Sequence, residues 1–457
     1  MPTTDIDTLG KLAQTLPSTG PRYTSYPTAN LFSEWQHEAN YQALWQEQPE
    51  EPISVYVHVP FCATVCYYCA CNKIHTANQV HAANYLDHLQ EEIRIQREVT
   101  GSRLVEQLHF GGGTPTSLSH AQMHNLFEHL ANEYTLSTAP SRDYSIELDP
   151  RKLDQRRVKQ LTDLGFNRIS VGIQDFDPAV QQAINRVQSE SETADVIETA
   201  RANGVTSVSV DLIYGLPLQT VDGFKRTLNQ TLRLQPDRLS LYSYAHLPQM
   251  FKIQRQIDSA TLPESATKLA LLLCAIETLE AAGYVYLGMD HFAKPSDPLV
   301  EASENGTLQR NFMGYTTHGH RELLGLGLSA IGQVGDLFTQ NHKTLNEYYN
   351  AIDDNQLPAA KGYLRHSDDQ LRAYVIAQLM CSLRLDKDAF EQRFNTNFDA
   401  QFQNEQSALN ALQKDGLLHQ DEYHIQVTPL GRFLIRNVCM VFDAYLDPGQ
   451  GRFSRTV

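Results

Sequence analysis

Six short segments beyond residue 50 alternate apolar and polar residues, and stretches with helical spacing of apolar residues lie between them. An alternating segment is typical of a β-strand that has one face on a core. Strand and helix repeated at this rhythm predict a parallel sheet built from β–α units. The predicted strands are Ser54–Pro60, Gln107–Gly112, Tyr144–Asp149, Arg168–Gln174, Val208–Tyr214 and Arg238–Tyr244.

The two faces of these strands differ in polarity. In the first strand Val55, Val57 and Val59 share one face, while Tyr56 and His58 share the other. A filled barrel would have apolar side chains on the inner face as well, so polar inner faces predict a lumen that holds ligands. We therefore expect an α/β fold, an incomplete (β/α)6 TIM-like barrel. A two-layer sheet with one solvated face is the alternative.

Local signals place some helix ends. Ser119 and Gln122 form a capping box for a helix after the second strand, and Gly165 and Gly204 are suited to end later helices. Gly325–Gly332 is similar to a dinucleotide-binding loop but lacks the strand–loop–helix context, so we expect it to be a loop that closes the ligand cavity.

The two ends of the chain predict other structures. We divide the chain into an N-terminal extension that covers the active site (1–50), the partial barrel with a closing segment (51–346) and a mostly helical, winged-helix-like C-terminal domain (347–457). In the last part we expect helices over Leu371–Leu385, over Phe390–Leu412 and from Leu430, and a hairpin formed by residues 417–418 and 425–427.

Composition excludes several classes of protein. The 457 residues include 53 acidic and 37 basic side chains, a net charge of −16, which disfavours nucleic acid as a partner. No apolar run is long enough to cross a membrane, and residues 1–20 do not have the pattern of a secretory signal. Four of the seven cysteines lie within ten positions, which does not suit a disulfide framework and fits the reducing cytoplasm.

The clustered cysteines are the strongest chemical signal. Cys62, Cys66 and Cys69 have C-x3-C-x2-C spacing and directly follow the first predicted strand. Three thiolates can bind three irons of a 4Fe–4S cube, whereas a cluster that only carries electrons normally has four cysteine ligands. The open fourth iron could bind S-adenosylmethionine (SAM) and support its radical chemistry. This motif resembles that of the radical SAM superfamily.

A zinc site is the alternative for these cysteines. Zinc usually takes two cysteine pairs or additional histidines. Cys71 is a possible fourth ligand, and His58 and His75 are near in sequence, but the chain has no second cysteine pair. His318 and His320 could also suggest a metal site, although an exposed turn fits them better.

Polar residues at later strand ends could hold SAM. Gly111–Thr116 ends the second strand, where its backbone could approach a ligand closely. Glu147, Gln174 and Asp211 could accept or donate hydrogen bonds, with a solvated strand-end side chain as the alternative for each. Arg186 could pair with a carboxylate or lie on a helix surface.

Several segments together resemble the oxygen-independent coproporphyrinogen III oxidase family over nearly the whole chain. Cys71–Lys73 and the Arg22 segment separate it from related haem-binding chaperones, which remain the alternative function. Ala70 stands where the family commonly has glycine. The matching segments are Pro21–Thr28, Tyr56–Cys62, Cys69–Lys73, Gly111–Thr116, Gly288–Phe292 and Asn311–Thr317.

This resemblance implies a radical enzyme of haem biosynthesis that converts the propionates on rings A and B of coproporphyrinogen III to vinyl groups. It implies one 4Fe–4S cluster and two SAM molecules. Cys62, Cys66 and Cys69 would bind the cluster. The first SAM would contact Tyr56, Tyr68, Gly112 and Glu147, and the second Gly113, Thr114, Gln174, Arg186, Asp211, Ala245 and Ile331.

The four propionates of the substrate need cations supplied locally by an acidic protein. Arg22 is our candidate for one carboxylate, with a structural anchor as the alternative. His58 and Cys71 are candidates for proton or electron handling near the cluster, with packing as the alternative. We also expect a monomer located in the cytoplasm, and an electron-donor protein such as flavodoxin or ferredoxin as its partner.

Overall fold

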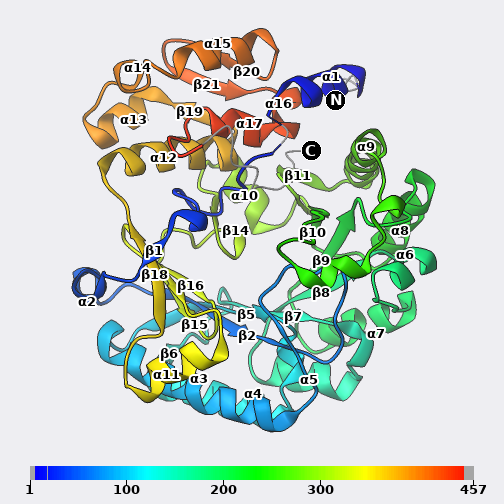
Figure 1. Ribbon diagram of the computed structural model, residues 1–457, viewed down its shortest axis with the longest axis vertical. Helices are drawn as coiled ribbons and strands as arrows, with labels where there is room; N and C mark the ends of the chain where they lie inside the picture. Colours follow the sequence, from blue (N-terminus) through cyan, green and yellow to red (C-terminus); the bar gives the residue numbers. More distant parts are fainter. Residues whose placement is uncertain (1–5, 18, 447–457) are drawn as a thin grey trace. The chain divides into compact units, whose positions relative to one another are not determined.

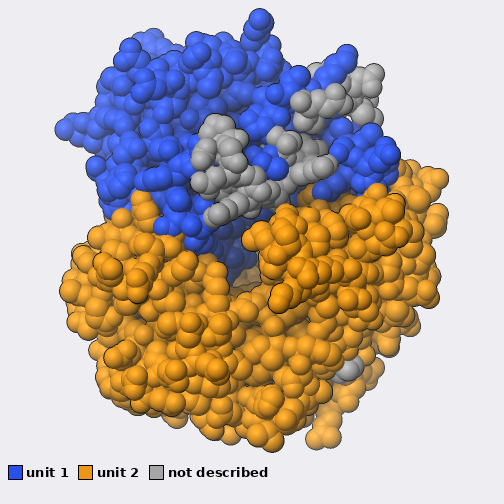
Figure 2. All heavy atoms as spheres, viewed as in Figure 1, with its two compact units in different colours: residues 1–31, 263–319, 365–457 blue, residues 32–262, 320–364 orange. Residues whose placement is uncertain are grey.

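The computed structural model describes residues 6–17 and 19–446, which form two compact units (Figures 1 and 2). Unit 1 comprises Met1–Leu31, Pro263–Gly319 and Arg365–Val457, and unit 2 comprises Phe32–Leu262 and His320–Leu364. The outermost residues of the predicted extension and C-terminal domain, 1–5 and 447–457, lie outside the described residues. The division at residues 50 and 346 stays a prediction.

Unit 2 is built on six parallel strands in the order in which they occur in the chain, as the alternation predicts. The order among the described strands is an open path. The strands are β2 (Ile53–Val59), β5 (Leu104–Gly112), β7 (Asp143–Leu148), β8 (Arg168–Gln174), β9 (Ser207–Tyr214) and β10 (Arg238–Ser243).

Helices follow these strands on the outer side of the sheet (Figure 1). The capping box of Ser119 and Gln122 is confirmed, and Gly165 and Gly204 have the positive φ of helix-ending glycines. The helices of unit 2 are α2 (Glu38–Glu47), α3 (Gln79–Thr100), α4 (His120–Glu133), α5 (Gln155–Asp163), α6 (Pro178–Ala183), α7 (Glu190–Ala202), α8 (Val221–Arg233) and α11 (Leu345–Asp353).

The strand faces divide as their sequences predict. Val55, Val57 and Val59 of β2 are fully buried against the helical layer, whereas Tyr56 on the opposite face is only partly buried. In β9, Val210 is fully buried and Asp211 is half-buried. The inner face is therefore polar enough to bind ligands.

The prediction of a loop at Gly325–Gly332 is wrong. The segment forms β15 (Leu323–Leu326), which pairs parallel with β2, a turn, and β16 (Ile331–Val334). A Cβ at Gly325 would lie 2.6 Å from the carbonyl oxygen of Ile331, so glycine permits close strand packing here. The sheet continues through β17 (Leu337–Asn341), β18 (Ala359–Leu364) and β1 (Ser33–Glu34), all antiparallel.

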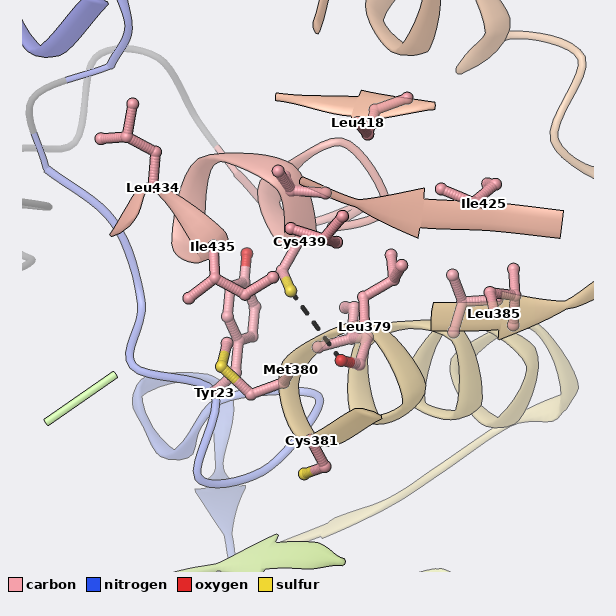
Figure 3. Close-up of a cluster of buried hydrophobic side chains, with 14 of the residues drawn as sticks. Tyr23, Leu379, Met380, Cys381, Leu385, Leu418, Ile425, Leu434, Ile435 and Cys439 are labelled. Atoms are coloured by element: carbon pink, nitrogen blue, oxygen red, sulfur yellow. Dashed lines mark hydrogen bonds between the residues drawn. The ribbon is translucent and has the colours of Figure 1, made fainter. Parts of the chain in front are cut away.

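Unit 1 has its own apolar core, part of which is shown in Figure 3. The predicted hairpin is confirmed as β20 and β21, and β19 pairs with β21 to complete a three-stranded sheet. The elements around this sheet are α12 (Ser367–Ser382), β19 (Arg384–Asp386), α13 (Lys387–Phe394), α14 (Phe398–Gln401), α15 (Gln406–Lys414), β20 (Leu418–Gln420), β21 (His424–Val427), α16 (Pro429–Phe433) and α17 (Ile435–Met440).

Two predicted helices of this unit need correction. The first ends at Ser382, since Leu383 has a left-handed conformation and the next residues pair as β19. The stretch Phe390–Leu412 is divided among three helices instead of one. Asn395 is left-handed and Asn397 caps the following helix, so these two side chains break the helical spacing.

The other segments of unit 1 contribute three helices and two short hairpins. They are α1 (Ile6–Thr15), α9 (Ser265–Ala281), α10 (Pro298–Glu304), the pair β11 (Val285–Gly288) and β12 (His291–Ala293), and the pair β13 (Gln309–Asn311) and β14 (Gly314–Thr316). Tyr23 donates to Asp443 at 3.0 Å, and Arg436 donates to the carbonyl oxygen of Pro21 at 2.9 Å. These bonds attach the N-terminal segment to the C-terminal part of the same unit.

Among the described residues, no helix has the length and apolar character needed to cross a membrane.

A buried carboxyl in α3 ties the outer layer of unit 2 to the β15–β17 region. Glu92 is fully buried and accepts hydrogen bonds from the backbone N–H of Gly327, the amide of Asn341 and the hydroxyl of Tyr348, at 2.5–2.7 Å. Burial raises the pKa of Glu92 from 4.5 to about 7.

We predict that Glu92 makes folding stability decrease as the pH rises from 4.5 to 7. Between these values the folded carboxyl holds a proton that the unfolded one has lost, so folding binds protons and is favoured by acid. Relative to Glu92→Gln, which cannot titrate, the wild type should lose up to about 3 kcal/mol over this window. Urea unfolding of both proteins at several pH values measures the difference. The exposed Glu98→Gln on the same helix is the control, and a pH-independent difference at Glu92 would contradict the prediction.

Candidate active site

The cysteine loop is held between the first strand and the segment after β8. Cys62 lies in β3 (Phe61–Cys62), which pairs with β4 (Ile74–His75) across the loop. The backbone N–H of Tyr67 donates to the carbonyl oxygen of Ile184 at 2.9 Å. The side-chain amide of Asn185 donates to the carbonyl oxygen of Val65 at 2.8 Å. These bonds fix the loop on the carboxyl-end side of the strands, where ligands of such folds bind.

The loop and the strand ends enclose a cavity of about 320 Å³. Of the residues predicted from sequence, Tyr56, His58, Ala245 and Ile331 do not line it, and Arg22 belongs to unit 1. The predicted residues that line it are Cys62, Cys66, Cys69, Cys71, Tyr68, Gly112, Gly113, Thr114, Glu147, Gln174, Arg186 and Asp211.

Two guanidinium groups lie against the central cysteine. Arg151 and Arg186 each place a nitrogen 3.6 Å from Cys66 Sγ, and Asp149 pairs with both arginines, at 2.5 and 3.4 Å. The two guanidinium groups are thus directed at the sulfur of one predicted cluster ligand. Sequence reasoning missed Asp149 and Arg151 as site residues, although Asp149 lies on the polar side of its predicted strand.

All seven cysteines are free, and the thiols of the loop have different environments. A hydrogen bond with Cys71 lowers the pKa of Cys69 to about 6, whereas burial raises the pKa of Cys62 to about 11. Nowhere in residues 6–17 and 19–446 do three His, Cys, Asp or Glu side chains gather around a position suited to one metal ion.

A hydrogen-bonded network that includes His58 packs against the glycine segment at the end of β5. His58 accepts from the Tyr56 hydroxyl at 3.0 Å through Nδ1 and donates through Nε2 to the carbonyl oxygen of Asn72 at 2.9 Å. Burial lowers the pKa of His58, so the ring is neutral with both nitrogens engaged. His109 stacks on Tyr56 and bonds to Glu147 at 3.4 Å. His109, like Asp149 and Arg151, is a contributor that the sequence did not reveal.

Gly112 and Gly113 form a cradle at the end of β5. Gly112 has φ +108°, and a Cβ there would lie 2.6 Å from the His58 ring. A Cβ at Gly113 would lie 2.8 Å from backbone atoms of Pro60 and Phe61. Glycine at both positions lets the strand end lie directly against the residues that lead into the cysteine loop.

One of the residues that line the cavity has a buried polar atom without a partner. Gln174 has φ +67°, and its side-chain oxygen is buried without a hydrogen-bond partner in the part of the chain that is described. Asp211 accepts from Ser170 at 3.2 Å, and burial raises its pKa to about 6. Because buried polar groups are normally satisfied, Gln174 indicates a polar ligand. Three thiols and these groups fit a cube with one open iron and a bound SAM.

Comparison with known proteins defines the class. The model of the radical SAM superfamily matches residues 56–231, and the model of the HemN C-terminal domain matches residues 365–434. The fold and the site are therefore those of a radical SAM enzyme, a class that uses a 4Fe–4S cluster and SAM.

Curated relatives define the family. Oxygen-independent coproporphyrinogen III oxidases from Pseudomonas aeruginosa and Escherichia coli are 47% and 45% identical, each over 96% of both chains. The solved structure of coproporphyrinogen III oxidase (HemN) from Escherichia coli, described as a radical SAM enzyme, has a TM-score of 0.91 at 45% identity and covers 93% of this chain and 98% of its own. The chain belongs to the oxygen-independent coproporphyrinogen III oxidase family, whose members are oxidoreductases of haem biosynthesis.

We predict that Gly112→Ala impairs cluster assembly beyond its effect on the backbone. The new methyl group must displace the His58 ring, which supports the cysteine loop through Asn72. Gly204→Ala is the matched control, because Gly204 also has positive φ but has open space around it. The control should lose only about 1 kcal/mol of stability. Iron content and visible absorption after anaerobic reconstitution measure assembly, and equal iron contents in both variants would contradict the prediction.

Proposed function

We propose that this chain converts two propionates of coproporphyrinogen III to vinyl groups without oxygen, giving protoporphyrinogen IX. The observation that supports this best is the cavity that joins three free thiols to a glycine cradle, in a chain that resembles this family over nearly its full length. When bound, the reduced cluster and SAM supply the radical that removes a hydrogen atom from the propionate. The described side chains bind, orient and shield the reactants.

We propose that the two SAM molecules divide the polar groups of unit 2. Glu147 would accept a hydrogen bond from the first SAM. Tyr56, Tyr68 and Gly112 would be the other contacts of this molecule. Its carboxylate lines the cavity and also accepts from the N–H of Gly112 at 3.2 Å. The second SAM would meet the unpaired oxygen of Gln174 and the half-buried Asp211. The other proposed contacts of the second SAM are Gly113, Thr114, Arg186, Ala245 and Ile331.

His58 and Cys71 remain proposals as catalytic groups. Both nitrogens of His58 are occupied, which favours its role in positioning the loop over proton transfer. Cys71 lines the cavity and is exposed, so it is accessible for proton or electron handling.

The electron donor is proposed to be a protein such as flavodoxin or ferredoxin. A depression of about 790 Å³ lies on another side of the cysteine loop, lined by Cys69 and Cys71. Its lining includes Lys73, Lys252 and the exposed Met250, and it has no carboxylate. Such a surface suits an acidic carrier.

The monomeric state stays a prediction, and the free cysteines support a cytoplasmic location.

Anaerobic turnover tests the reaction. Reconstituted protein with dithionite, SAM and coproporphyrinogen III should form protoporphyrinogen IX and 5′-deoxyadenosine together. Cleavage of SAM without vinyl product would refute the substrate while leaving the radical chemistry intact. Tight haem binding without decarboxylation would favour the haem-chaperone alternative.

Arg22 is proposed to bind one substrate carboxylate. It forms an ion pair with Asp290 within unit 1, and its side chain is 32% exposed. We predict that Arg22→Ala loses decarboxylation and keeps the cluster, whereas Asp290→Asn keeps most activity. If Arg22 were only an anchor, the two variants would lose thermal stability and activity in parallel. Melting temperature, iron content and turnover are the measurements.

A further inference from the structure

Arg310 of β13 is a partly buried cation that forms no ion pair with any described residue. Its Nε and Nη1 atoms are buried and have no hydrogen-bond partner among the described residues. Its guanidinium carbon lies 4.9 Å from the ring centre of Tyr315, the residue opposite it in the β13–β14 hairpin. A buried charge is unfavourable unless it is paired and hydrogen-bonded, and a single ring contact compensates only part of that loss.

Arg432 in α16 repeats this arrangement. Its guanidinium carbon lies 4.6 Å from the ring centre of Tyr286, and its Nε is buried without a partner in the described part of the chain. Burial lowers the pKa of Arg432, although Glu280 acts on it electrostatically without forming an ion pair. Tyr315 interacts electrostatically with both arginines, so the two cations belong to one cluster.

The rings that support the two arginines are themselves fixed. Tyr315 donates to the carbonyl oxygen of Met380 at 3.2 Å and is packed edge-on against His291 at 5.0 Å. Tyr286 donates to the carbonyl oxygen of Met289 at 2.9 Å. The guanidinium groups are therefore held on rigid supports, and N–H groups of both have no hydrogen-bond partner among the described residues, as a preorganised anion site requires.

The remaining charges of the cluster are accounted for. Asp290, which also acts on Tyr315, forms its ion pair with Arg22. Arg310 and Arg432 therefore carry positive charge that no described ion pair neutralises, in a chain with net charge −16. Planar guanidinium groups bind carboxylates in a two-pronged manner.

We propose that Arg310 and Arg432 form a carboxylate-binding site in unit 1, and that its ligand is a propionate of the tetrapyrrole substrate. The identity of the ligand rests on the proposed function. This site supplies cations that are not already neutralised within the chain, whereas the charge of Arg22 is offset by Asp290.

Arg310→Met tests the site through binding and stability together. Met keeps the apolar stem and removes the uncompensated charge. The variant should bind coproporphyrinogen III about 10- to 100-fold more weakly, which corresponds to the loss of a charged hydrogen bond. Its melting temperature without substrate should be equal or higher, because ligand sites often lower stability. Arg310→Lys should bind with intermediate affinity, since it keeps the charge and loses the planar fork.

Two controls separate this site from a structural role and from charge in general. Arg372, in the same unit, pairs with Asp368 and Glu405, so Arg372→Met should lower the melting temperature and leave substrate affinity unchanged. The tetramethyl ester of coproporphyrinogen III keeps the ring without its charges, and it should bind wild type and Arg310→Met equally.

Unchanged affinity of Arg310→Met for the free acid, measured anaerobically by fluorescence, would overturn the proposal. A lower melting temperature with unchanged affinity would assign Arg310 a structural role instead. Failure of the proposed function is distinguishable, because the wild type would then form no protoporphyrinogen IX whatever the variants bind.

Discussion

The structure depends on the short loop that carries three thiols and is fixed against the carboxyl ends of the parallel strands. Its two sides are joined by the β3–β4 pair, and its central part is bound to the segment around Ile184 and Asn185. Because the ligands are supplied by three residues within eight positions, the cube they hold keeps one iron for a substrate molecule. Polar residues of the later strands line the same cavity as these cysteines.

The alternation of residues was sufficient to predict the six strands of unit 2 and the polarity of their faces. Each strand is short and apolar on one side, and the local signals at Ser119, Gly165 and Gly204 agree with the tertiary structure. The errors arose at a glycine and an asparagine, where backbone geometry that side-chain periodicity does not encode decides the structure. Gly325 permits two strands to pack closely, which no local pattern reveals, and Asn395 breaks a helix whose apolar spacing continues.

The candidate site was predictable to the extent that its chemistry lies in a motif. The cysteines and the glycine segment meet in one cavity, as do Glu147 and Asp211 from later strands. Asp149 and Arg151 were missed because an arginine beside a carboxylate is common on protein surfaces. Their value comes from a 3.6 Å approach to Cys66 that only the fold creates. The same limit applies to Arg310, whose unpaired burial is a property of packing.

An acidic chain that acts on a substrate with four carboxylates must concentrate positive charge locally. The two units do this differently. In unit 2, two arginines are paired with Asp149 and directed at the sulfur of Cys66. In unit 1, Arg310 keeps unsatisfied N–H groups, which suits an anion that arrives from solution. Charge that is already neutralised organises the cofactor site, and charge that is not neutralised is available for the substrate.

The most direct test of this account is electron–nuclear double resonance on the reduced, reconstituted protein with SAM labelled at its amino nitrogen and carboxylate oxygen. The account predicts hyperfine coupling from both labelled atoms to the cluster, because both bind the iron that the three cysteines leave open. Absence of coupling from SAM, together with coupling from a fourth protein ligand to that iron, would contradict it.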